Sequence, residues 1–106
     1  MKLEFDVDQY VEKIKHTNSY FHTFINKETL AVGVLMLSPG EKDIQEPHTN
    51  DEVYFVLEGN GFLKINNRSY PVSKNKLYFV AKNTPHFFYG NSKNLVVLYF
   101  FGGSDS

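Results

Sequence analysis

The 106-residue chain contains no cysteine and no tryptophan. Without cysteine it can form neither a disulfide framework nor a zinc site built on thiolates. Charge of one sign is not in excess either, because 11 Lys and Arg residues face 12 Asp and Glu residues. We therefore expect no nucleic-acid partner, since such a partner calls for a basic surface. The apolar run at residues 95–101 has the length of a buried strand and is too short to span a membrane as a helix.

The N-terminal residues 1–8 lack the apolar stretch of a signal peptide. Together with the lack of cysteine, this leads us to expect a cytoplasmic protein with no membrane partner. The length is near the usual size of one domain. Because no repeat, linker or low-complexity segment divides the chain, we expect a single domain over residues 1–106, with a disordered tail at residues 102–106.

Aromatic residues are abundant, with ten Phe and seven Tyr, and can fill a core in so short a chain. The N-terminal part predicts one short helix, at about residues 6–15. Its apolar residues, among them Val7 and Ile14, recur at helical spacing, and either Asp6 or Asp8 can cap its start.

The segment at about residues 19–101 shows alternating apolar positions interrupted by frequent turns, a pattern typical of an all-β sandwich or closed barrel. Asn66 and Asn67 tolerate positive φ and suit a two-residue hairpin. Gly59 and Gly61 mark another reversal. The expected strands are residues 20–25, 29–37, 53–57, 62–65, 69–72, 77–80, 86–89 and 95–101.

The segment 40–59 places three chemically versatile side chains, Glu46, His48 and Glu52, just ahead of an expected strand. Glu46 and His48 are two apart and share a face if the chain is extended there. In a straight strand His48 and Glu52 would lie roughly 13 Å apart, too far to share an ion. The turn-forming residues 49–51 predict a bend that brings Glu52 back beside His48.

His86 follows a second turn and begins a later strand, with Phe88 on the same face. Two histidines and one or two carboxylates are the ingredients of a divalent-metal site. Tyr54, Phe88 and Tyr99 are expected either to line a pocket beside that site or to pack in the core. The charged residues 41–43 most simply form a solvated loop.

The first cluster resembles the first motif of the cupins, Gly-x5-His-x-His-x3-Glu-x6-Gly. Every spacing fits, and the one departure is Glu46 where the motif has its first histidine. The residues at the motif positions are Gly40, Glu46, His48, Glu52 and Gly59.

The second cupin motif, Pro-x-Gly-x2-His-x3-Asn, is matched more loosely. His86 is present, whereas Ala81 and Asn83 replace the proline and the glycine. Gly90 stands at the asparagine position, with Asn91 one residue later. The resemblance covers about residues 29–101.

This resemblance implies a cupin-like (RmlC-like) jelly-roll β-barrel with a metal ion inside one end. It implies that His48, Glu52 and His86 are ligands and that Glu46 occupies the fourth position. Small single-domain cupins are commonly homodimers, so the resemblance also implies a homodimer.

Two roles for Glu46 remain open. It either binds the metal, so that two carboxylates neutralise a divalent ion, or it acts as an acid–base group beside a site of two histidines and one carboxylate. Either set suits Fe or Mn, with Zn, Ni or Co as alternatives.

Three functions are consistent with this site. The first is a metal-dependent enzyme acting on a small molecule, with a dioxygenase-like oxidoreductase favoured over an isomerase or lyase. The second is a non-catalytic cupin that binds a small molecule. The third is an interaction protein with a vestigial site, which the retained His48, Glu52 and His86 argue against.

Overall fold

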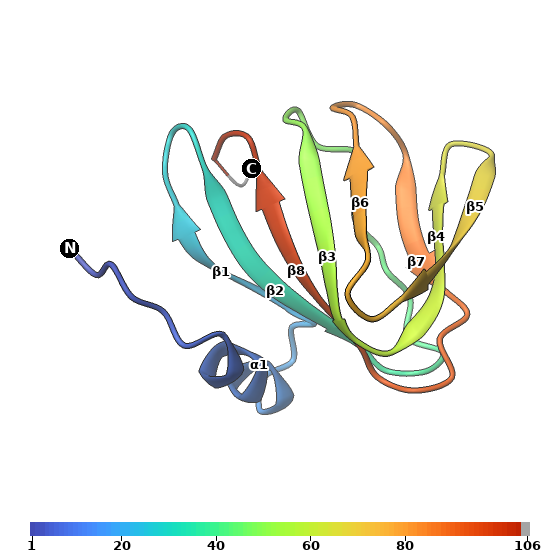
Figure 1. Cartoon of the computed structure of the whole chain (residues 1–106), viewed down its shortest axis with the longest axis horizontal. Helices are drawn as coiled ribbons and strands as arrows, with labels where there is room; N and C mark the ends of the chain where they lie inside the picture. Colours follow the sequence, from blue (N-terminus) through green and yellow to red (C-terminus); the bar gives the residue numbers. More distant parts are fainter. Residues whose placement is uncertain (105–106) are drawn as a thin grey trace.

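The computed structural model of the chain describes residues 1–104. Within this part the chain forms one helix and eight strands, arranged as two facing layers of sheet with the helix at one side (Figure 1). The elements are α1 (Val7–Lys15), β1 (Phe21–Asn26), β2 (Ala31–Leu37), β3 (Glu52–Glu58), β4 (Asn60–Ile65), β5 (Arg68–Ser73), β6 (Leu77–Val80), β7 (His86–Tyr89) and β8 (Leu95–Phe101).

One sheet has five strands in the order β1-β2-β8-β3-β6, and the other has three in the order β5-β4-β7. The strand pairs are antiparallel. Their facing sides enclose an apolar core that includes Leu35, Leu63 and Val97. The prediction of an all-β fold with a short N-terminal helix is therefore confirmed.

Local sequence explains where the key elements begin. Asp6 caps α1 by accepting a hydrogen bond from the Asp8 amide at 3.1 Å, which settles the choice between the two aspartates. In β3 inward and outward residues alternate, so Glu52 and Tyr54 are buried on the inner face. That alternation carries a carboxylate into the core.

The reversal expected at residues 59–61 joins the two sheets, because β3 and β4 belong to different ones. Gly59 has φ 96° and Gly61 has φ 148°, values that favour glycine. A Cβ at Gly59 would lie 2.5 Å from the Asn94 carbonyl oxygen, so this corner has no room for a side chain.

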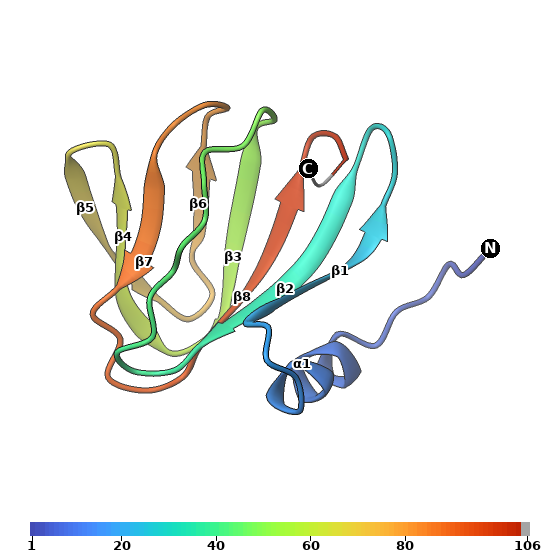
Figure 2. The same ribbon diagram turned by 180° about the vertical axis from the view of Figure 1, so that it is seen from behind.

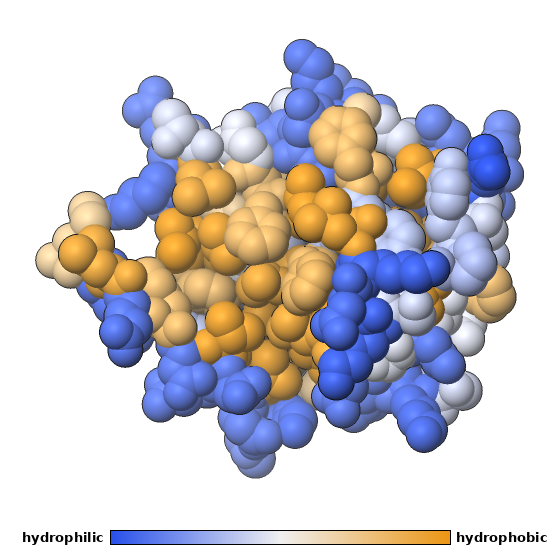
Figure 3. All heavy atoms as spheres, viewed as in Figure 1, coloured by the Kyte–Doolittle hydropathy of each residue, from blue (hydrophilic) through white to orange (hydrophobic). Residues whose placement is uncertain are grey.

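The outer face of the five-stranded sheet is also apolar, as the orange area of Figure 3 shows. Helix α1 packs against β1 and β2, and the outer sides of β8, β3 and β6 continue beyond it. The outward residues of these three strands include Val53, Phe55, Leu77, Phe79, Leu98 and Phe100. The described residues include no helix with the length and apolar character needed to cross a membrane.

The beginning of the expected disordered tail is held in place. Gly102 donates its amide to the Asp51 carbonyl at 2.9 Å, and Asn50 donates its side-chain amide to the Ser104 carbonyl at 3.1 Å. Residues 102–104 therefore contact the bend at residues 49–51. Residues 105–106 lie outside the described residues.

Candidate metal centre

Three side chains predicted as ligands converge at one end of the space between the sheets. His48, Glu52 and His86 each offer an atom suited to a metal, and these atoms all lie within 4.8 Å of one another. Glu52 begins β3, His86 begins β7, and His48 lies in the connection between β2 and β3. Glu52 and His86 are buried, and His48 is half-buried.

The predicted bend at residues 49–51 brings His48 and Glu52 together. Two hydrogen bonds from the turn before β7 hold this bend in place. Asp51 accepts the Lys82 amide at 2.9 Å, and the His48 carbonyl accepts the Asn83 amide at 2.7 Å. These contacts join the loop before β3 to the turn before β7. The two segments that carry the histidines are therefore fixed to each other by one side-chain and one backbone hydrogen bond.

His86 has a defined ring orientation. Its Nδ1 lies 2.8 Å from the Thr84 carbonyl oxygen, which can only accept, so Nδ1 carries a proton. Its Nε2 faces the centre, 3.2 Å from Glu52 Oε1 and 2.9 Å from the Tyr54 hydroxyl. A backbone hydrogen bond to the far ring nitrogen is the usual way to orient a metal-binding histidine.

Glu52 is the unsatisfied group of the centre. Both carboxylate oxygens are buried, and neither has a hydrogen-bond partner among the described residues; the approach of His86 is a close charge contact. A buried carboxylate left this way is costly. A cation held between Glu52 and the two histidines would satisfy it, so the residues fit a divalent metal ion.

In the metal-free protein, a proton on His86 partly balances the charge of the buried Glu52 carboxylate. Burial alone lowers the pKa of His86, but the contact with Glu52 and the hydrogen bond to Thr84 together outweigh burial and raise the pKa above 6.5. His86 is therefore favoured as an imidazolium beside the Glu52 carboxylate.

Tyr54 lies at the centre of the cluster. Its hydroxyl donates to Gln45 Oε1 at 3.2 Å and contacts His86 Nε2. Burial, reinforced by the charges of Glu52 and Asp43, raises its pKa well above 10, so the phenol stays neutral. The Phe88 ring packs edge-on against Tyr54 at 4.8 Å between centroids, on the core side.

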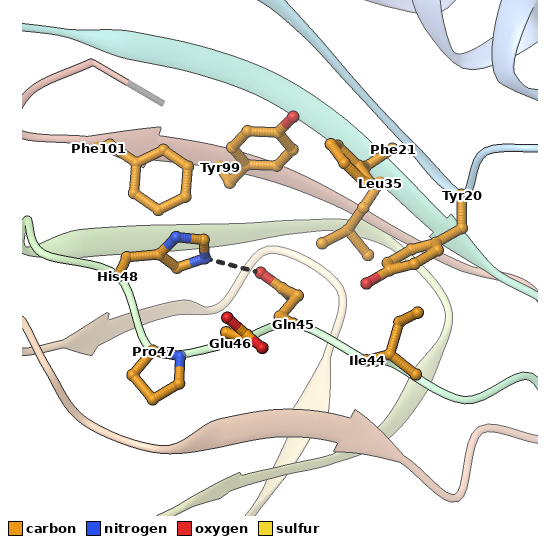
Figure 4. Close-up of a pocket in the computed structure, with 10 residues that line it drawn as sticks. All are labelled: Tyr20, Phe21, Leu35, Ile44, Gln45, Glu46, Pro47, His48, Tyr99 and Phe101. Atoms are coloured by element: carbon orange, nitrogen blue, oxygen red, sulfur yellow. Dashed lines mark hydrogen bonds between the residues drawn. The ribbon is translucent and has the colours of Figure 1, made fainter. Parts of the chain in front are cut away.

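A pocket of about 390 Å³ opens beside His48 (Figure 4). Tyr99 forms part of its wall, whereas Tyr54 and Phe88 lie deeper, outside its lining. The Tyr99 ring lies over Gly33, where a Cβ would overlap it, and its hydroxyl is hydrogen-bonded to Thr23 at 2.7 Å. The lining residues are Tyr20, Phe21, Leu35, Ile44, Gln45, Glu46, Pro47, His48, Tyr99 and Phe101.

The structure does not bring Glu46 into the group of three. Glu46 is exposed and lines the pocket, while its neighbour Gln45 turns its side chain toward His48 (Figure 4). The roles suggested for Glu46 stay predictions.

Sequence reasoning missed both Gln45 and Asp43. Asp43 was placed in a solvated loop, yet it accepts hydrogen bonds from Gln45 and from the Phe88 amide. Their spacing of two puts both on one face if the segment is extended, but it does not tell which face points inward.

Comparison with known proteins places this geometry in a family. The cupin domain family matches residues 33–101, more than half of the chain. An uncharacterized protein from Streptomyces coelicolor is 30% identical over 95 residues, which are 90% of each chain.

Solved structures share the fold at low sequence identity. An RmlC-like cupin from Shewanella frigidimarina has a TM-score of 0.72 at 13% identity, covering 81% of this chain and 77% of the other. The DMSP lyase DddQ from Ruegeria pomeroyi has a TM-score of 0.72 at 18% identity, covering 78% of this chain. This chain spans only 46% of that lyase. The expected cupin-like barrel is thus confirmed, and the chain belongs to the cupin family as a small cupin-domain protein.

Proposed function

We propose that this cupin is a divalent-metal-dependent enzyme acting on a small organic molecule, with a dioxygenase-like oxidoreductase as the leading activity. The observation that carries the proposal is the buried Glu52 carboxylate, which lies between two histidines and accepts no hydrogen bond among the described residues. Two histidines and one carboxylate are the ligand types of the facial triad in non-haem Fe(II) oxygenases.

The donor set suggests which metals to expect. Imidazole nitrogen and carboxylate oxygen, with no sulfur, favour Fe or Mn and leave Zn, Ni or Co as alternatives. A bound ion would supply Lewis-acid or oxygen-activating chemistry. The protein orients His86 through Thr84 and buries Glu52 away from water, which strengthens their attraction for a cation.

The pocket suggests how a substrate is held. Its volume of about 390 Å³ suits a small organic molecule. Buried faces of Leu35, Tyr99 and Phe101 form its inner wall and exclude water, while His48 connects it to the metal ligands. Exposed Glu46 also lines the pocket, and we propose it as a proton acceptor for bound substrate.

A metal-dependent isomerase or lyase is the second candidate. It is favoured by Glu46 along the pocket and by the neutral Tyr54 phenol beside His86, because proton transfer needs such groups. The name of the DMSP lyase is consistent with it, although that likeness shows the fold alone. A non-catalytic cupin that binds a small molecule in the same pocket is the remaining alternative.

Metal content of freshly purified, untagged protein tests the proposal first. We expect close to one Fe or Mn per chain, or uptake of that amount when Fe(II) or Mn(II) is added. Filling of less than about a tenth of the sites, with no uptake, would rule out the metal-dependent function. Oxygen consumption with a panel of small apolar acids and alcohols then separates the oxidoreductase from the isomerase or lyase, which consume none.

We further propose that the protein is a homodimer and has neither a nucleic-acid nor a membrane partner. The outer face of β8, β3 and β6 is apolar and extends over a few hundred Å² by strand spacing and length. Leu77 and Phe79 on it are 61% and 59% exposed. Because the outward residues Val53, Phe55, Leu77, Phe79, Leu98 and Phe100 carry no charge, this part of the face can meet a second copy about a two-fold axis without repulsion.

Analytical ultracentrifugation tests the dimer. We expect a dimer at micromolar concentration, and a monomer after Phe79→Lys, with Lys74→Ala as the control on an exposed residue. A wild-type monomer at such concentrations would contradict the proposal.

A further inference from the structure

The side chain that approaches the metal ligands from the loop between β2 and β3 belongs to Gln45, one residue before the position that the cupin motif assigns. Gln45 Oε1 lies 3.2 Å from His48 Nε2 and 3.2 Å from the Tyr54 hydroxyl. Tyr54 in turn lies 2.9 Å from His86 Nε2. Figure 4 shows the Gln45 side chain pointing to His48.

The direction of the Gln45 amide is fixed by chemistry. Asp43 Oδ2 lies 3.0 Å from the amide nitrogen of Gln45, and a carboxylate can only accept a hydrogen bond. The NH₂ group of Gln45 therefore faces Asp43, and its oxygen faces His48 and Tyr54. Asp43 is held in turn by the Phe88 amide at 2.9 Å and the Tyr20 hydroxyl at 3.0 Å.

The hydrogen bond between His48 and Gln45 shows which of the two side chains carries the shared proton. An amide oxygen cannot donate, so the hydrogen bond between His48 and Gln45 requires a proton on His48 Nε2. If a divalent ion took the place of this proton, His48 Nε2 and Gln45 Oε1 would be the two atoms available to hold it. Side-chain amide oxygens are ordinary ligands for hard divalent ions.

We infer that Gln45 supplies the fourth protein ligand through its amide oxygen, and that Glu46 does not bind the metal. This rests on the metal site of the proposed function. The ligand set is then two neutral histidines, one neutral amide and the Glu52 carboxylate, which leaves one positive charge on a divalent centre. Ligation by Glu46 would have cancelled that charge. The centre therefore favours substrates that present an anionic oxygen.

The test compares Gln45→Leu, which removes the amide and keeps bulk, with Glu46→Ala. We expect Gln45→Leu to weaken Mn(II) binding, measured by calorimetry, about 10- to 100-fold. Glu46→Ala should change it less than about threefold. Circular dichroism and the unfolding midpoint check that both variants are folded.

Spectroscopy separates a ligand from a residue that only positions His48. In Mn(II)-loaded protein with isotope-labelled glutamine side chains, electron–nuclear double resonance should show coupling to an amide carbon. The coupling should vanish in Gln45→Leu and persist in Gln9→Ala, because Gln9 lies on α1.

The outcomes fall into distinct classes. Wild-type protein that binds no metal overturns the proposed function together with this inference. Wild-type protein that binds Mn(II), with Gln45→Leu binding equally well, or with no amide coupling, overturns the inference alone. A large loss in Glu46→Ala without one in Gln45→Leu assigns the fourth position to Glu46.

Discussion

The candidate centre has two halves that are built differently. Glu52 and His86 stand at the starts of strands, where pairing with neighbouring strands fixes their positions. His48 and Gln45 stand on a connection without regular secondary structure. The Gln45 side chain is held by Asp43 and Tyr54, and the His48 side chain is held by Gln45. Sheet register thus sets one half of the site, and a short polar network sets the other.

This difference predicts a difference in tolerance. A strand position is held by many backbone bonds, so removing its side chain deletes a ligand and leaves the scaffold in place. A loop position depends on a few side-chain contacts, so a change in one member moves the others. Substitutions in the two halves should therefore separate loss of a ligand from loss of alignment.

The largest effect is expected in the strand half. Glu52→Ala and His86→Ala should each abolish stoichiometric metal binding, because each removes one of the three convergent ligands, while the fold survives. Metal analysis and circular dichroism measure the two properties. Glu58→Ala, at the exposed end of the same strand, is the matched control. Full metal binding in either ligand variant would contradict the assignment.

A second prediction concerns pH. His86 has a raised pKa in the folded, metal-free protein, so its contribution to stability is complete below about pH 6.5 and is lost as pH rises through the raised pKa. That contribution is about 1.4 kcal/mol for each unit by which the pKa is raised. Metal binding should show the opposite trend, strengthening up to about tenfold per pH unit in this range, since the metal displaces a proton.

Urea unfolding in the presence of a chelator, at several pH values, measures the first trend, and Mn(II) titration measures the second. His86→Gln should weaken the pH dependence of both the metal-free stability and the Mn(II) affinity. Metal-free stability that rises with pH over this window would show that His86 is not held as an imidazolium.

The smallest effect is expected in the polar network of the loop half. In Asp43→Asn the side chain can donate as well as accept, so the Gln45 amide is no longer held with its oxygen inward. We expect metal affinity to fall a few-fold and the free energy of unfolding to fall by about 1–3 kcal/mol. Lys42→Ala, an exposed neighbour, should change stability by less than about 0.5 kcal/mol. Equal effects of the two substitutions would remove Asp43 from the network.

The same division explains how far the sequence could lead. Period-two alternation placed β6, β7 and β8 at their observed bounds and turned Glu52 and His86 inward. The turn chemistry of residues 49–51 predicted the bend that brings His48 to Glu52. These features depend on local sequence, and local sequence was sufficient for them.

Gln45 and Asp43 could not be found in this way. Their direction is set by contacts with Tyr54 and Phe88, which are distant in sequence, and a loop has no period that points its side chains. The motif points to Glu46 because it is defined by residue spacing. In the structure, the side chain beside His48 is that of Gln45. An irregular segment can reach the same point in space with a neighbouring residue.

The hydrogen bond from the Phe88 amide to Asp43 has a consequence for the solubility of the folded chain. Strand β7 is an edge of its sheet, and the loop carrying Asp43 runs along it between the two layers (Figure 2). Asp43 occupies an amide that would otherwise be open to pairing with a strand of another molecule, and it adds a negative charge there. The residue that aligns the Gln45 amide thus also removes one pairing position from this edge.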